Sequence, residues 1–292
     1  MSDVLIVGNV TKDVYLRLDN RQNRFERDQN ETVWLDLAFD GSSHNFYERH
    51  SVFGGAAVTL EVLSRFGLAA KIMGSELGFE SGQLTGQIVA EVYRYILCQD
   101  ENIAYFCPSH TVAAQWQEPT GDAKWIYMDR SACGSRELVE KIWNYVESRP
   151  DVKLALYDCG RDNLVDAEVY IQNLEARAEW IFTEVEKKCG EDGKYIYIGE
   201  GRVRVSDKRI RWSLQDRQDL MTHLTTNSII AASMLGALVG GKSVEEALLL
   251  ARANVESADL NGTLSLTRLE EMTVGENYRV ENISDKQENQ NG

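Results

Sequence analysis

Short, continuous apolar runs, each followed by a segment with helical periodicity, constrain the fold of this chain more than any other feature. The runs lie at residues 3–10, 69–74 and 152–158, and they are rich in Val, Ile, Leu and Ala. Strands that are buried on both faces have this composition, and they occur in parallel sheets whose connections are helices. We therefore expect a doubly wound α/β fold, in which a mainly parallel sheet carries helices on both faces.

Two other segments break this rhythm, because their apolar residues alternate with polar ones. Residues 14–50 contain two such pieces around a charged turn, and residues 102–118 contain two more around Pro108. Alternation with period two predicts antiparallel strands that have one face in solvent. We expect these strands to form a small β lid, inserted in one domain over residues 1–280, and we expect the polar tail at 281–292 to be disordered.

Six segments have the periodicity of helices, with apolar residues three or four positions apart. The segment 228–239 is apolar on nearly every face, which predicts a buried helix. Thr225, Thr226 and Asn227, which precede it, have the side chains of a helix cap. The other five helical segments are 54–67, 81–100, 136–149, 162–190 and 243–260.

Composition and charge exclude several classes of function. The net charge of −15 disfavours nucleic acids and anionic membranes as partners, because their phosphates would be repelled. The five cysteines are widely spread and the four histidines have no zinc spacing with them, which predicts reduced thiols and no zinc site. Without a signal sequence or an apolar run of about 18 residues, we expect a cytoplasmic protein.

Three collinear blocks within residues 3–270 carry a resemblance to a known family. They read VLIVGNVTKDVYLRLD, FGGAAVTLEVLSRFGLAAKIMGSELG and TTNSIIAASMLGALVGGKSVEEALLLARAN. In this order they resemble the PfkB, or ribokinase-like, carbohydrate and nucleoside kinases. The resemblance implies a kinase with ATP and Mg²⁺ as cofactors, which transfers the γ-phosphoryl group to a hydroxymethyl group of a sugar or nucleoside.

The resemblance also locates the Gly-Ala-Gly-Asp signature of the family, from which this chain departs. The four positions hold Leu224, Thr225, Thr226 and Asn227. In the family, the glycines let backbone N–H groups approach the phosphate, and the aspartate takes the proton of the attacking hydroxyl. An asparagine cannot take that proton, and β-branched threonines resist the backbone that glycine permits. Catalysis is therefore expected to be impaired.

Three interpretations of this segment remain open. It is a polar cap for a core helix, a working site that uses another base such as Asp216, Asp219 or His223, or an anion or nucleotide site without turnover. The function predicted is accordingly a sugar or nucleoside kinase with impaired catalysis. The alternative is a non-catalytic PfkB-like protein that binds a small molecule, a nucleotide or a protein partner.

Other site residues follow from the resemblance alone. Asp13, Gly54 and Gly55 correspond to positions that contact the substrate, although a turn at a strand end or a helix start would explain them as well. Gly199 lies in a turn that corresponds to the one beside the nucleotide. A loose Thr-x-x-Glu match ends at Glu186, which would lie near magnesium, unless it is a glutamate on a surface helix.

The apolar face predicted for the lid needs a cover. Its residues Val33, Leu35, Leu37 and Phe39 alternate with polar ones, so substrate, the main body or a second subunit has to shield them. Some relatives in the family pair their lids, and the resemblance therefore implies a homodimer through the β lid.

Overall fold

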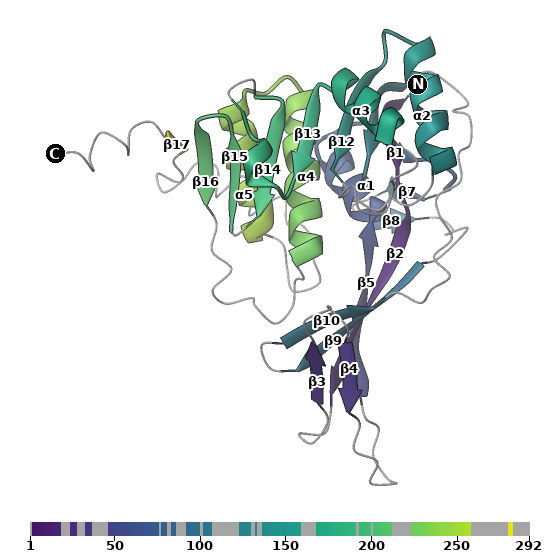
Figure 1. Ribbon diagram of the computed structural model, residues 1–292, viewed down its shortest axis with the longest axis vertical. Helices are drawn as coiled ribbons and strands as arrows, with labels where there is room; N and C mark the ends of the chain where they lie inside the picture. Colours follow the sequence, from purple (N-terminus) through teal and green to yellow (C-terminus); the bar gives the residue numbers. More distant parts are fainter. Residues whose placement is uncertain are drawn as a thin grey trace, which may run out of the picture. The chain divides into compact units, whose positions relative to one another are not determined.

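The computed structural model describes most of the chain, and all structural statements below concern the residues it describes. The helices and strands are shown in Figure 1. Along this part of the chain, no helix is long and apolar enough to cross a membrane. The described residues are 2–18, 24–27, 33–36, 46–75, 77–80, 83–85, 92–99, 102–106, 123–129, 132, 136–158, 168–190, 193–199, 201–211, 223–257 and 280–282.

The largest sheet of the described residues has nine strands in the order β17-β16-β15-β14-β13-β12-β11-β1-β6. The strands from β6 to β14 in this order run parallel, and β15, β16 and β17 continue the sheet as antiparallel strands. The mainly parallel sheet predicted from the three apolar runs is confirmed. Its strands are β1 (Ser2–Val7), β6 (Ala70–Ile72), β11 (Ala123–Met128), β12 (Lys153–Tyr157), β13 (Trp180–Thr183), β14 (Tyr195–Gly199), β15 (Arg202–Val205), β16 (Lys208–Arg211) and β17 (Glu281–Asn282).

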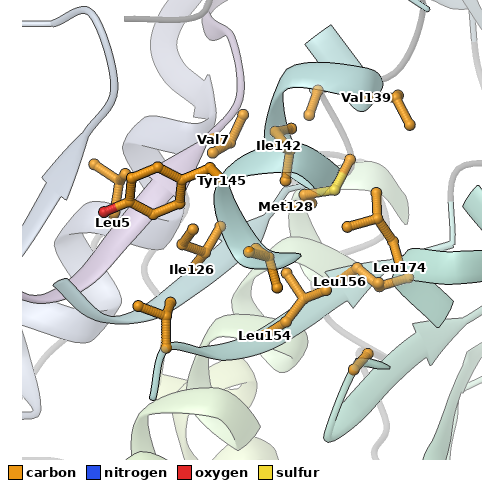
Figure 2. Packing of buried hydrophobic residues seen from close by; sticks show 14 of the residues in the cluster. Leu5, Val7, Ile126, Met128, Val139, Ile142, Tyr145, Leu154, Leu156 and Leu174 are labelled. Carbon is orange, nitrogen blue, oxygen red and sulfur yellow. The ribbon is translucent and has the colours of Figure 1, made fainter. Parts of the chain in front are cut away.

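Helices cover both faces of this sheet, as its apolar strands predict. Successive residues of β1 point to opposite faces of the sheet. Leu5 and Val7 pack with residues of α2 and α3 on one face, and Val4 and Ile6 are fully buried on the other. Figure 2 shows the hydrophobic core on the face of Leu5 and Val7, where strand residues pack against Ile142 of α2 and Leu174 of α3. The helices are α1 (Ala56–Arg65), α2 (Arg136–Ser148), α3 (Glu168–Arg177), α4 (His223–Val239) and α5 (Val244–Ser257), with a short 3₁₀ turn, η4, at Glu186–Lys188.

The helix α4 is buried on all sides, which confirms the prediction for 228–239. Every residue from 226 to 237 is buried, and α4 contacts α1, α5 and β14. The approach of α1 to α4 depends on Gly236, because a Cβ atom there would lie 2.9 Å from Cγ of Phe66. However, α4 begins at His223, so Thr225, Thr226 and Asn227 lie inside the helix. Their interpretation as a cap that precedes the helix is wrong.

Two helical predictions are corrected by the strands that replace them. Residues 81–100 contain β8 (Gln83–Thr85) and β9 (Val92–Gln99) in their described part. The run at 92–97 is almost continuously apolar, and pairing with strands on both sides favours the extended form over a helix. In the described part of 162–190, residues 168–190, the one α-helix is α3, and the apolar run at 180–183 is β13. The tail prediction also began too early, since β17 occupies 281–282.

The chain divides into two compact units, and the smaller one consists of Val10–Gly54 and Ala90–Val112. Its described part is a β structure, with a four-stranded sheet in the order β10-β9-β2-β5 and the antiparallel hairpin β3-β4. The strand β2 pairs with β9 in parallel, so residues 14–50 do not form the simple antiparallel hairpin that was predicted. Leu37, Phe39 and residues 107–118 lie outside the described residues. The strands are β2 (Val10–Leu18), β3 (Arg24–Arg27), β4 (Val33–Asp36), β5 (Phe46–Gly55) and β10 (Asn102–Phe106); in the larger unit, β7 (Gly78–Glu80) pairs with β8.

Candidate functional site

Acidic residues follow three neighbouring strands at the carboxyl edge of the parallel sheet. Asp129, Asp158 and Glu184 come directly after β11, β12 and β13. Open α/β sheets bind ligands at this edge, because the strand ends and the loops after them converge there. The three residues were not predicted as site residues, although IYMD, ALYD and IFTE each place an acid after an apolar run.

The most exposed of the three acids, Glu184, is joined to the position at which the signature aspartate was expected. The amide nitrogen Nδ2 of Asn227 donates to Oε1 of Glu184 at 2.8 Å, and the hydroxyl of Tyr157 donates to the same oxygen at 3.0 Å. Asn227 is 0% exposed and Tyr157 is 2% exposed, whereas Glu184 is exposed. Glu184 thus links an exposed residue at the end of β13 to the buried amide of Asn227.

The start of α4 combines backbone N–H donors with a buried hydroxyl that has no partner among the described residues. Thr226 is 3% exposed, and its hydroxyl oxygen has no hydrogen-bond partner among the described residues. Thr225 and Leu224 lie in the first turn of α4, where backbone N–H groups lack partners within the helix. Backbone N–H groups at a helix N-terminus are donors of the kind that bind phosphate groups, whereas the hydroxyl oxygen of Thr226 is buried.

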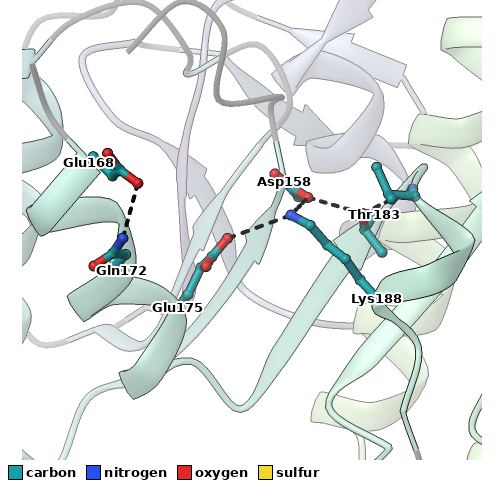
Figure 3. A network of polar contacts seen from close by, with 7 residues as sticks. Asp158, Glu168, Gln172, Glu175, Thr183 and Lys188 are labelled. Atoms are coloured by element: carbon teal, nitrogen blue, oxygen red, sulfur yellow. Dashed lines mark hydrogen bonds and ion pairs between the residues drawn. The ribbon is translucent and has the colours of Figure 1, made fainter. Parts of the chain in front are cut away.

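Asp158 lies in a polar network that fixes the segment after β13. Its oxygen Oδ2 accepts a hydrogen bond from the hydroxyl of Thr183 at 3.0 Å and another from the ammonium group of Lys188. Figure 3 shows Lys188 between Asp158 and Glu175, whose Oε1 is 4.0 Å from Nζ. The hydroxyl of Thr183 in turn accepts a bond from the backbone N–H of Val185. These contacts hold the turn that presents Glu184.

Glu186, the predicted magnesium position, is engaged by two arginines. Its Oε2 lies 2.8 Å from Nη2 of Arg202, and its Oε1 lies 3.7 Å from Nη1 of Arg204. Two guanidinium groups thus already engage this carboxylate. Glu186 starts the turn η4 and not a surface α-helix, and its place beside magnesium stays a prediction.

Gly199 ends β14 against the ring of Tyr197. A Cβ atom at this position would lie 2.7 Å from the hydroxyl oxygen of Tyr197, so no larger residue fits without movement of that ring. Arg202 covers the same ring, with its guanidinium carbon 5.7 Å from the centroid. The packing of Tyr197 therefore explains the glycine without reference to a nucleotide.

The predicted substrate residues are distributed over both units. Asp13 and Gly54 belong to the smaller unit, where Asp13 pairs in register with Arg94, and their side-chain surroundings lie outside the described residues. Gly55 precedes α1 with a φ of +59°, a backbone that side chains larger than hydrogen rarely adopt. Its neighbour Ala56 donates a backbone hydrogen bond to the carbonyl of Asn9 at 3.0 Å. Gly55 thus has a conformational role at this turn.

A buried pair that the sequence interpretation missed joins α1 to β11. The hydroxyl of Thr59 donates to Oδ2 of Asp129 at 2.9 Å, and the two residues are 0% and 1% exposed. The backbone N–H of Asp129 donates to the carbonyl of Val7. This aspartate is positioned by the fold and enclosed by it.

Comparisons with known proteins give a fold but no close relative. No model of a protein family matches the sequence, and no curated protein matches it. Among solved structures, the Arabidopsis thaliana ribokinase with ribose and ATP is 13% identical, with a TM-score of 0.60 over 94% of this chain and 99% of that one.

Two further structures agree with this result. The Burkholderia thailandensis nucleoside kinase with inosine is 13% identical, with a TM-score of 0.58 over 94% of this chain and 99% of that one. An Escherichia coli structure assigned as a ribokinase II, with ATP and Mg²⁺, is 11% identical, with a TM-score of 0.62 over 94% and 99%. These matches show that the chain has the ribokinase-like α/β fold.

Proposed function

We propose that this chain, which has the ribokinase-like fold, is an ATP-dependent phosphotransferase that acts slowly on a hydroxyl group of a sugar or nucleoside. The observation that carries the proposal is the fold match over 94% of the chain to structures that hold ribose with ATP, or inosine. Fold alone does not fix function. The proposal therefore also relies on the polar groups at the carboxyl edge of the sheet.

In this proposal the nucleotide phosphates lie at the start of α4. The N–H groups of the first turn supply donors, with Thr225 and Thr226 in that turn and Gly199 at the neighbouring strand end. Asp13, Gly54 and Gly55 remain the proposed substrate positions. Magnesium enters the assay as a complex with ATP, and Glu186 remains the proposed position beside it.

The slow rate follows from Asn227. A positioned general base contributes about 10²–10⁴-fold to a rate, which corresponds to about 3–5 kcal/mol of barrier. Protein kinases turn over at about 1–100 s⁻¹. A chain in which no other group takes over the role of the aspartate is expected to have a kcat on the order of 10⁻⁴ to 1 s⁻¹.

A second candidate function is binding without turnover. Two features favour it: Asn227 is completely buried, and two guanidinium groups hold Glu186. Both residues are therefore less accessible to a ligand at positions that the family uses in phosphoryl transfer. In this case the protein binds a nucleotide, a sugar or a nucleoside and releases it unchanged.

Two measurements on the wild-type chain separate these functions. ADP release is followed with magnesium and ATP against ribose, inosine and a panel of other sugars and nucleosides, and Tm is measured with ATP alone. Slow, acceptor-dependent ADP release with a raised Tm supports the phosphotransferase, since a ligand that binds the native state raises Tm. A raised Tm without turnover supports binding only. If neither occurs, both functions are wrong.

A further inference from the structure

We infer that Glu184 accepts the proton of the substrate hydroxyl, in place of the aspartate that this chain lacks at position 227. The inference rests on the proposed phosphotransferase function and adds the residue that performs proton transfer. It depends on the pairing of Glu184 with Asn227, which brings together residues from the end of β13 and the start of α4.

Glu184 lies close enough to Asn227 to act in place of the missing aspartate. An asparagine amide and an aspartate carboxylate have the same shape, so the amide of Asn227 marks where an aspartate carboxylate would lie. The Oε1 atom of Glu184 is 2.8 Å from Nδ2 of that amide. A carboxylate oxygen is therefore present within one hydrogen bond of the missing base, and it belongs to an exposed residue.

The pairing also orients the carboxylate. Asn227 and Tyr157 both donate to Oε1 of Glu184, and both donors are buried, so they belong to rigid parts of the sheet and of α4. A general base has to be held within hydrogen-bond reach of the proton it removes. Two fixed donors on one oxygen restrict the rotation of the side chain and present the carboxylate in a defined direction.

The two neighbouring acids are less suited to this role. Asp158 is paired with the ammonium group of Lys188 and with Thr183, and its side chain is only 7% exposed. Asp129 is 1% exposed and bonded to Thr59, so solvent and substrate do not reach it in this structure. Among the acids that follow β11, β12 and β13, Glu184 is the exposed one.

The chemical step is balanced with ATP as the phosphoryl donor. The substrate oxygen attacks the γ-phosphorus, and the bond from that phosphorus to the β–γ bridging oxygen breaks, so ADP leaves with the electron pair. Glu184 accepts the hydroxyl proton as the new oxygen–phosphorus bond forms. The proton is returned to solvent after the product leaves, which restores the carboxylate.

The test uses Glu184→Gln in the full-length chain. Glutamine accepts a hydrogen bond from Asn227 through its carbonyl oxygen, so the contact persists and only the proton acceptor is lost. We expect kcat for ADP release to fall by about 10²–10⁴-fold while KM for ATP and for the acceptor stays unchanged. The control is Glu137→Gln, which removes a carboxylate from the exposed pair of Glu137 with Lys141 on α2 and should leave kcat unchanged.

A double variant moves the carboxylate by one hydrogen bond. In E184Q/N227D the amide at position 184 donates a hydrogen bond to the carboxylate at position 227. The pair is therefore kept, with donor and acceptor exchanged. We expect this variant to recover kcat relative to E184Q, which a purely structural role for Glu184 does not predict. Equal kcat for the wild type and E184Q, or a rise in KM with kcat unchanged, would overturn the inference.

The outcome also separates this inference from the proposed function. Acceptor-dependent turnover in the wild type that E184Q leaves unchanged preserves the phosphotransferase and removes Glu184 as its base. A Tm that rises with ATP but no turnover with any acceptor refutes the base and leaves nucleotide binding. No turnover and no rise in Tm refute both.

Discussion

Replacing Asn227 with aspartate is expected to destabilise the protein at neutral pH, because the change sets two carboxylates against each other. The amide nitrogen that now donates to Glu184 at 2.8 Å becomes an acceptor oxygen in N227D. At that separation two unit charges repel by about 1.5 kcal/mol in water and by about 6 kcal/mol at an effective dielectric constant of 20. Glu184 is exposed, so the repulsion lies toward the lower figure.

The lost hydrogen bond adds to this repulsion. A bond to a charged group contributes about 1.5–3 kcal/mol. We therefore expect the free energy of unfolding of N227D at pH 7 to fall by about 3 kcal/mol. For a chain of this length, that lowers Tm by about 5 °C.

The loss should depend on pH with a definite sign. In the variant, like charge raises the pKa of one carboxyl of the pair above its unfolded value, which is near 4. The folded variant then binds more protons than the unfolded chain, so its stability falls as the pH rises from about 4 through the raised pKa. The difference from the wild type should be small near pH 4 and largest above pH 7.

Urea unfolding of the wild type, N227D and E184Q/N227D at pH 5 and pH 7.5 measures this effect. The double variant has one carboxylate and one amide, so it should recover most of the stability at both pH values. An N227D protein that is as stable as the wild type at pH 7.5, or whose loss does not change with pH, would show that positions 184 and 227 are not paired in solution.

Three further predictions concern other parts of the structure. Lys188→Met should lower the free energy of unfolding, measured in urea, by about 3 kcal/mol, because Asp158 and Glu175 lose their positive partner. An equal loss in the control Lys187→Met, at an exposed lysine, would contradict the reasoning. Gly55→Ala should cost about 1–3 kcal/mol, because its φ is +59°, and an unchanged Tm would argue against that backbone. The proposed lid dimer should give a species of twice the 33.0 kDa chain mass in light scattering, and a monomer alone at tens of micromolar would reject it.

The parallel sheet could be predicted from the sequence because its signal is local. The runs at 3–10, 69–74 and 152–158 are short, apolar and rich in residues that favour strands, and each is a strand of the large sheet. The buried helix at 228–239 was predictable for the same reason. A continuous apolar run of this kind indicates a buried element, whichever elements pack against it.

The run at 92–97 could not be assigned in this way. Its residues are apolar at nearly every position, so both a buried helix and a strand satisfy the pattern. The partners decide, since β9 pairs with β2 about 80 residues earlier and with β10 immediately after it. The start of α4 was misjudged for a related reason. Thr225 and Asn227 are good capping residues, but α4 begins before them, and the amide of Asn227 donates to Glu184.

For the three acids at the sheet edge, the position could be predicted from the sequence but the interactions could not. Their position was available from the sequence, because a residue that follows a buried parallel strand lies at the edge where ligands bind. Their chemistry depends on partners from distant parts of the chain: Asp129 is enclosed with Thr59 of α1, Asp158 is neutralised by Lys188, and Glu184 is held by Tyr157 and Asn227. Among the three, the last arrangement leaves an exposed residue with a held carboxylate, one hydrogen bond from Asn227, where the family resemblance implies a base.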